Sequence, residues 1–109
     1  MYLYKEKYTI DFRDARSYAD IHDIIKKELD FPDHYGKNLD AFWDCLTDMV
    51  GRKVHIEILN LDAAERILGA ENTRMFISTL KDFKHYQGDR YYNDILIEIV
   101  SGQTRVSLT

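Results

Sequence analysis

The sequence contains little cysteine, proline or glycine, and it has no long apolar segment. Its 109 residues include one cysteine, one proline and five glycines. A single cysteine excludes an internal disulfide and is typical of a reducing compartment. The scarcity of proline and glycine argues against a disordered or linker-rich chain. No segment approaches the roughly 20 apolar residues of a membrane span. The first residues also lack the apolar run of a signal peptide, so we expect a cytoplasmic protein that does not associate with membranes.

The chain also lacks an excess of basic residues. It has 15 Lys and Arg against 19 Asp and Glu, a formal net charge of −4 and a pI near 5.5. Binding to phosphates needs clustered Lys and Arg, so we expect no direct nucleic-acid partner, and a cationic protein surface fits better. The hydrophobic content of 45% is ample for one core, and we predict a single domain over residues 1–109.

Alternation and apolar spacing predict an α/β fold. We expect strands at 3–12, 54–59, 95–100 and, after a turn at Ser101-Gly102, 104–108. We expect helices at 18–29, 39–50, 63–68 and 71–86. This order predicts a layer sandwich in which a small parallel sheet with a three-stranded core packs with about four helices, most of them on one face.

Several residues are expected at helix ends. Ser17 is placed to cap the first helix, and Asp62 with Glu65 forms a variant of the capping box before the third. Gly51 and Gly88 are natural residues to follow the second and fourth helices.

The segment around the second predicted helix is the most unusual part of the chain. Gly36 permits a tight turn, and Asn38 is expected to cap the helix that follows. At about 100° per residue, Asp40, Asp44 and Asp48 form a row on one side of this helix. Trp43 lies at the border with an apolar side made of Leu39, Phe42, Leu46, Met49 and Val50.

The residues alone leave three interpretations of the aspartate row open. Like charges four residues apart each cost a helix roughly 0.2–0.5 kcal/mol, and no Lys or Arg lies between Asp40 and Asp48. The row is a solvated helix face, a Mg²⁺ site of carboxylates one turn apart, or an interface that enters a basic pocket of a partner. Trp43 is correspondingly either the rim of the core or an interface anchor.

The sequence offers little for catalysis. It contains no H-E-x-x-H, paired C-x-x-C, P-loop or G-x-S-x-G motif. His34 precedes the turn, but no serine or cysteine is spaced to act as its nucleophile. His22 is expected on a helix surface, and His55 half-buried on a strand. We therefore expect no catalytic residue, no metal and no cofactor.

A specific run within residues 26–47 consists of Lys26-Lys27-Glu28-Leu29, Pro32, Tyr35-Gly36, Asn38-Leu39-Asp40-Ala41 and Trp43-Asp44-Cys45-Leu46-Thr47. This run closely resembles the barstar family of bacterial intracellular inhibitors of a secreted ribonuclease, barnase. The resemblance implies a small parallel sheet with helices. It also implies that the second helix and the loop before it plug a nuclease active site, with a helix aspartate in the place of an RNA phosphate.

Carried onto this chain, the resemblance makes Asp44 the phosphate-like aspartate and Asp40 the second acidic contact, with Trp43 between them. Gly36 and Asn38 then shape the loop.

The sequence departs from the family at three positions. His34 stands where the family has the first tyrosine of a pair, and Lys37 replaces an acidic residue. The glutamate that the family contributes from its last long helix has its nearest match in Asp82.

The main hypothesis is an inhibitor of a secreted, guanyl-preferring microbial ribonuclease, monomeric when free. Its partner-binding residues would be His34, Gly36, Asn38, Asp40, Trp43, Asp44 and Asp82. The alternative within the same fold is a binding or immunity module for a different basic toxin or regulatory protein. A Mg²⁺-dependent enzyme is the alternative from another class.

Overall fold

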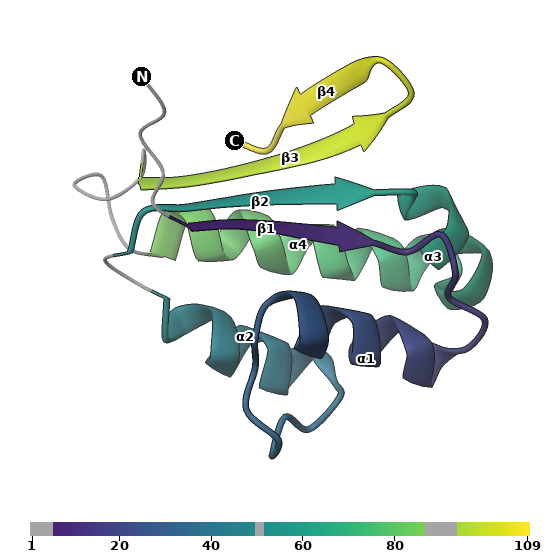
Figure 1. The fold of residues 1–109 in the computed structure, drawn as a ribbon, viewed down its shortest axis with the longest axis horizontal. Helices are drawn as coiled ribbons and strands as arrows, with labels where there is room; N and C mark the ends of the chain where they lie inside the picture. Colours follow the sequence, from purple (N-terminus) through teal and green to yellow (C-terminus); the bar gives the residue numbers. More distant parts are fainter. Residues whose placement is uncertain (1–5, 50–51, 87–93) are drawn as a thin grey trace.

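The computed structural model describes residues 6–49, 52–86 and 94–109 (Figure 1). The elements in chain order are β1 (Glu6–Asp11), α1 (Tyr18–Glu28), α2 (Leu39–Thr47), β2 (Val54–Leu59), α3 (Leu61–Leu68), α4 (Ala70–Tyr86), β3 (Ile95–Ser101) and β4 (Thr104–Ser107). This order confirms the predicted α/β class, including the additional C-terminal strand. Within the described ranges, no helix combines the length and apolar character needed to cross a bilayer.

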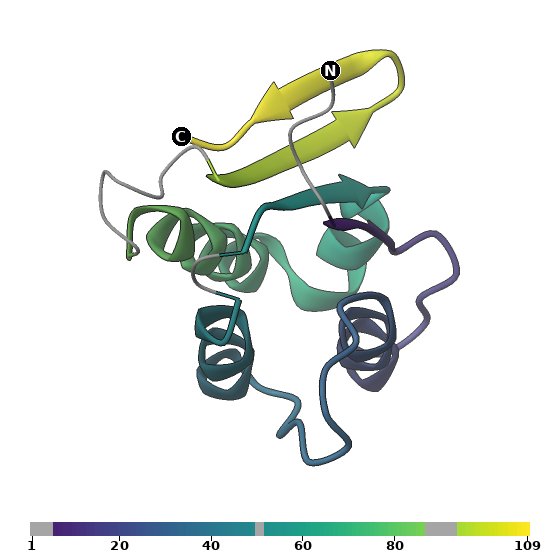
Figure 2. The same cartoon turned by 60° about the vertical axis from the view of Figure 1, so that its left-hand side comes forward.

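The four strands form one sheet in the order β1-β2-β3-β4. The first three strands are parallel, and β4 returns antiparallel to β3. All four helices lie on one side of this sheet (Figures 1 and 2), as right-handed crossovers between parallel strands require. Both β2 and β3 are interior strands, and β2 is the more deeply buried of the two.

Alternation along the strands gives the sheet two different faces. Successive side chains point to opposite sides, and the parallel register aligns Ile56 with Ile97 beneath the helices. The next position in the same register aligns Thr9, Glu57 and Glu98 on the opposite face. The helix-covered face is therefore apolar, and the other face is polar.

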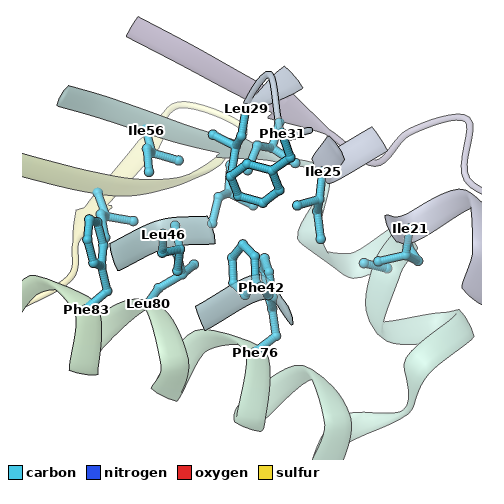
Figure 3. Close-up of a cluster of buried hydrophobic side chains, with 14 of the residues drawn as sticks. Ile21, Ile25, Leu29, Phe31, Phe42, Leu46, Ile56, Phe76, Leu80 and Phe83 are labelled. Carbon is cyan, nitrogen blue, oxygen red and sulfur yellow. The ribbon is translucent and has the colours of Figure 1, made fainter. Parts of the chain in front are cut away.

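The core joins the helices to the apolar face of the sheet (Figure 3). Phe42 of α2 stacks on Phe76 of α4, with ring centroids 5.2 Å apart and an interplanar angle of 26°. Leu46, one turn further along α2, lies beside Leu80 of α4 (Figure 3) and is also completely buried. At the other end of α4, the buried Lys84 amine donates to the carbonyl oxygen of Ile95 and so holds α4 against β3.

Of the caps predicted for the first and third helices, one is confirmed and the other is wrong. The Ser17 Oγ accepts a hydrogen bond from the Asp20 amide at 3.1 Å, so the predicted cap of α1 is confirmed. The Asp62–Glu65 capping box is wrong, because α3 begins two residues earlier, at Leu61. The preceding Asn60 has a left-handed backbone (φ 56°) that turns the chain directly from β2 into the helix.

One predicted boundary is wrong, because the second helix, expected to reach Val50, ends at Thr47 with Asp48 as its C-cap. The expected helix ends at Gly51 and Gly88, and the first residues of the first strand, lie outside the described residues.

The stacked pair at the centre of the core gives a stability prediction. We expect Phe42→Ala to lower the free energy of unfolding by about 3–5 kcal/mol, because it removes a completely buried ring and leaves a cavity. Urea denaturation followed by circular dichroism measures the loss. The exposed Val106→Ala is the control and should change stability by less than about 0.5 kcal/mol. Similar small losses for both variants would contradict this description of the core.

Candidate functional site

Helix α2 separates an acidic side from a buried side. Phe42 and Leu46 are completely buried, whereas Asp40 and Asp44 are exposed on the opposite side of the helix. The N-cap is the predicted one: Asn38 Oδ1 accepts a hydrogen bond from the Ala41 amide at 2.8 Å. Because the buried side is fixed in the core, the two carboxylates have a fixed direction toward solvent.

The aspartates of α2 have no ion-pairing partner among the described residues. Elsewhere in the same ranges, acidic side chains such as Glu6, Asp23 and Glu57 are paired with Arg or Lys. The effect of the uncompensated charge is visible at Cys45, whose thiol pKa is raised first by burial and then by the negative charges of Asp48 and Asp44. The row is therefore a site of uncompensated negative charge.

In the loop between α1 and α2, the left-handed backbone conformation does not occur at the glycine that was predicted to make the turn. We expected Gly36 to supply the tight turn, but the left-handed backbone belongs to Asp30 (φ 56°) at the start of the loop and to Lys37 (φ 55°) just before the N-cap of α2. Glycine at 36 has another role, because a Cβ there would lie only 3.3 Å from the Cβ of Ala41. Asn38 also donates from Nδ2 to the carbonyl oxygen of Gly36 at 3.3 Å, which ties the loop to the start of α2.

A buried hydrogen bond holds the same loop to α1. The Tyr35 hydroxyl lies 2.7 Å from His22 Nδ1, and the Tyr35 ring packs 5.2 Å from that of Phe31. The prediction that His22 lies on a helix surface is wrong, because its side chain turns inward and the residue is only 4% exposed. Burial, and then the nearby Lys37 charge, lower the pKa of His22, so the neutral imidazole is favoured. Burial also raises the pKa of Tyr35.

The basic residue in the loop is neutralised by α1. The Lys37 amine lies 2.8 Å from Asp23 Oδ1, and this hydrogen bond holds the pKa of Asp23 below its ordinary value. The positive charge of Lys37 is thus balanced by a partner on α1. Sequence reasoning missed Asp23, because its partner lies in a loop beyond the end of α1 and no helical spacing relates the two.

Helix α4 adds an aromatic residue beside Trp43. The rings of Trp43 and Tyr86 are 5.2 Å apart at 78°, and Tyr86 is 60% exposed. Asp82, exposed and without an ion pair in the described part of the chain, lies four residues before Tyr86 and therefore on the same side of α4. Sequence reasoning missed Tyr86, although its spacing from Asp82 was a usable signal.

His34 is the remaining predicted residue, and it is exposed in the loop between α1 and α2. We group these predicted residues of the loop, α2 and α4, together with Tyr86, under the name α2 surface; the contact of Trp43 with Tyr86 links α2 to the end of α4. The α2 surface consists of His34, Gly36, Asn38, Asp40, Trp43, Asp44, Asp82 and Tyr86.

The residues best placed for a metal lie on the other face of the sheet. Within residues 6–49, 52–86 and 94–109, the one group of three potential ligands whose donor atoms approach one another is His55, Glu57 and Glu98, within 4.8 Å. The three aspartates of α2 form no such group there, so the magnesium interpretation of the row loses its support.

That cluster is already an ion-pair network. Arg105 of β4 pairs with both Glu57 and Glu98, and Lys7 lies 3.3 Å from Glu57. The Arg105 guanidinium, more than Lys7, holds the pKa of Glu57 below its ordinary value. His55 Nε2 lies 2.6 Å from Glu98. Two cationic side chains balance the two carboxylates, so the arrangement fixes the strands to one another rather than inviting a further cation.

The sequence matches a known protein family and a curated protein. A family model described as Barstar (barnase inhibitor) matches residues 6–97. A protein of Bacillus subtilis (strain 168) named "Putative ribonuclease inhibitor YrdF" is 44% identical over 64 residues, which are 59% of this chain and 70% of that protein. The family match includes the whole α2 surface and ends within β3, before β4 begins.

The buried His22 gives a pH prediction. Its pKa is below the ordinary value of 6.5 in the folded state, so the folded protein takes up a proton less readily than the unfolded chain. Stability that is complete above pH 6.5 is therefore lost as the pH falls below that value. We expect His22→Gln to weaken this loss between about pH 6.5 and 5, before carboxylates dominate.

Urea denaturation at several pH values measures the effect of this substitution. His34→Gln, which changes an exposed loop histidine, is the control and should keep the wild-type pH dependence. Parallel stability curves for the wild type and His22→Gln would contradict the burial of a neutral imidazole.

Proposed function

The chain belongs to the barstar family, and from this premise we propose that it inhibits a secreted, guanyl-preferring microbial ribonuclease by covering its active site. The observation that carries the proposal is the set of exposed carboxylates on α2 that have no ion pair among the described residues. A partner with a basic pocket would supply the missing charges. The proposal is a non-catalytic inhibitor that acts in the cytoplasm and is monomeric when free.

The proposed mechanism is substitution of a phosphate by a carboxylate. A nuclease must hold the RNA phosphate with Arg, Lys or His, and these groups bind a carboxylate through the same charge-assisted hydrogen bonds. Asp44 takes the position of the phosphate, and Asp40 pairs with a neighbouring cation. Because the helix already fixes the backbone of both residues, less conformational entropy is lost on binding than for aspartates on a loop.

The rest of the α2 surface surrounds these carboxylates. Trp43 and Tyr86 supply apolar area beside the charges, a combination found at the energetic centres of protein interfaces. His34 and Gly36 bring the loop against the rim of the enzyme, and Asp82 adds a carboxylate from α4. The hydrogen bond of Tyr35 to His22 keeps the loop in place before binding.

A second candidate is a binding or immunity module for a different basic toxin or regulatory protein. It is favoured by His34 and by Lys37, whose charge is balanced within the protein by Asp23 rather than left for a partner. Titration against a panel of microbial ribonucleases that includes barnase separates the two. Absence of any complex at micromolar concentration would favour the second candidate.

The position of Asp44 relative to Asp48 gives the first binding prediction. We expect Asp44→Ala to weaken inhibition by at least about 30-fold, because it leaves the cationic groups of the nuclease unpaired. Asp48 is the C-cap, a turn further from the loop, so Asp48→Ala should change inhibition by less than about threefold. Titration of barnase activity measures both, with circular dichroism confirming that each variant is folded. Equal losses would overturn the proposed orientation of α2.

The unpaired carboxylates also predict a dependence on salt. We expect the association rate to fall about tenfold or more between low salt and 0.5 M NaCl, because screening removes the attraction between the charged surfaces. Stopped-flow mixing with barnase measures this rate. A double variant, Asp40→Asn with Asp44→Asn, should associate more slowly and respond less to salt. An association rate that salt leaves unchanged would contradict an acidic interface.

A further inference from the structure

A small cavity lies between the helices, and none of the residues of the α2 surface lines it. It is lined by α1, the start of α2, the end of α3 and the first half of α4, it opens to solvent, and its volume is about 100 Å³. Its apolar walls are Ile21, Ile25, Leu39, Leu68 and Phe76. Ile21 and Ile25 project from α1 into the part of the core where Phe76 lies (Figure 3).

The cavity is lined by one buried polar residue, His22, which has a ring nitrogen without a partner among the described residues. His22 is only 4% exposed, and its Nδ1 is used by the Tyr35 hydroxyl. Its second ring nitrogen, Nε2, has no hydrogen-bond partner in the part of the chain that the structure describes. Buried polar atoms are nearly always hydrogen-bonded in native proteins, so an orphaned one calls for a partner from outside the chain.

The mouth of the cavity is formed by two exposed residues. The Tyr18 ring lies 4.8 Å from the His22 ring, and Tyr18 is about half exposed. Asn72 donates from Nδ2 to the carbonyl oxygen of Leu68 at 2.9 Å, which leaves its Oδ1 without a partner among the described residues. No charged side chain lines the cavity. A ligand that enters here is therefore neutral, with a polar group near His22.

We propose that this cavity binds a neutral one-ring aromatic alcohol of the size of phenol. The ring would pack against the apolar walls, and the hydroxyl would bond to His22 Nε2. A hydroxyl both donates and accepts, so it satisfies Nε2 whichever ring nitrogen carries the proton. The volume agrees with this size, because an engineered apolar cavity of 150 Å³ binds benzene and the present cavity is somewhat smaller but opens to solvent.

The site is connected to the loop through a single side chain. His22 would hold the ligand with Nε2 while it holds Tyr35 with Nδ1. The ligand would thus bind behind the loop rather than on the α2 surface. Binding can be tested on the free protein, so the result does not depend on the identity of the nuclease.

Titration of the full chain with phenol, followed by amide chemical shifts in NMR spectra, tests the proposal. We expect saturable shifts centred on His22 and the cavity walls, a Kd on the order of 1 mM, and a higher melting temperature. Toluene is the matched probe because it keeps the ring and lacks the hydroxyl, and we expect it to bind at least about fivefold more weakly. Equal affinity for the two probes would overturn the role of His22. A linear, unsaturated response to phenol would overturn the site itself.

Two substitutions locate the binding. Leu68→Phe fills the cavity and should abolish the saturable shifts, whereas Ile67→Phe, at the neighbouring position on α3 outside the cavity, should leave them unchanged. Tyr18→Ala removes an exposed wall of the mouth without touching the core and should weaken binding several-fold, which keeps the test valid if Leu68→Phe is unstable. Phenol affinity that none of these substitutions changes would place the ligand elsewhere and contradict the proposal.

Discussion

The contact of Phe42 and Leu46 with α4 determines how the α2 surface is presented to solvent. Helix α2 is short and has two completely buried side chains, and Phe42 also packs against Phe31 of the preceding loop, with ring centroids 6.2 Å apart. Once Phe42 stacks on Phe76, rotation of α2 about its axis would expose a ring or bury a carboxylate, and either change is costly. The direction of Asp40 and Asp44 is therefore set by hydrophobic packing on the opposite side of the helix. The direction of the acidic side chains is well defined because the closely packed core beneath α2 is rigid.

The conformation of the loop before α2 is likewise held by specific contacts with neighbouring residues. Lys37 adopts a left-handed backbone that costs a non-glycine residue on the order of 1 kcal/mol or more, and its neighbours must hold it there. They do so from three directions: Asp23 holds the Lys37 side chain, Asn38 holds the carbonyl of Gly36, and His22 holds Tyr35. Helix α1 thus supplies two of the three anchors although it makes no part of the α2 surface.

Much of this organisation could be predicted from the sequence, because it depends on local patterns. The strands at 54–59 and near 95–100, the caps at Ser17 and Asn38, and the buried side of α2 follow from periodicity and cap chemistry, and the structure has them. The burial of His22 was missed although its spacing, three residues before Ile25 and seven before Leu29, places it on the buried side of α1. What spacing does not give is the Tyr35 hydroxyl that bonds to the buried imidazole.

Two further kinds of feature could not be predicted from the sequence: which residues adopt a left-handed backbone, and which residues of distant helices come into contact. Glycine is the usual residue for a left-handed turn, so the sequence pointed to Gly36, whereas Asp30, Lys37 and Asn60 adopt that conformation. Asp and Asn take it more readily than other non-glycine residues, and Lys37 is held there by its neighbours. The neighbouring positions of Trp43 and Tyr86 depend on how two distant helices pack, which spacing within either helix does not encode. The family match identifies the class of protein, but the partner-binding roles of the individual residues stay predictions.

The antiparallel pairing of β4 with β3 has a consequence for solubility. Without β4, the apolar seven-residue β3 would be the edge of the sheet, and its unpaired amide and carbonyl groups could template association with another chain. β4 moves that edge outward to a strand of four residues, all exposed. Arg105 then fastens this strand across the polar face through Glu57 and Glu98, which hinders it from peeling away. By covering the backbone edge of β3, the β3–β4 hairpin reduces the tendency of the sheet to pair with other chains.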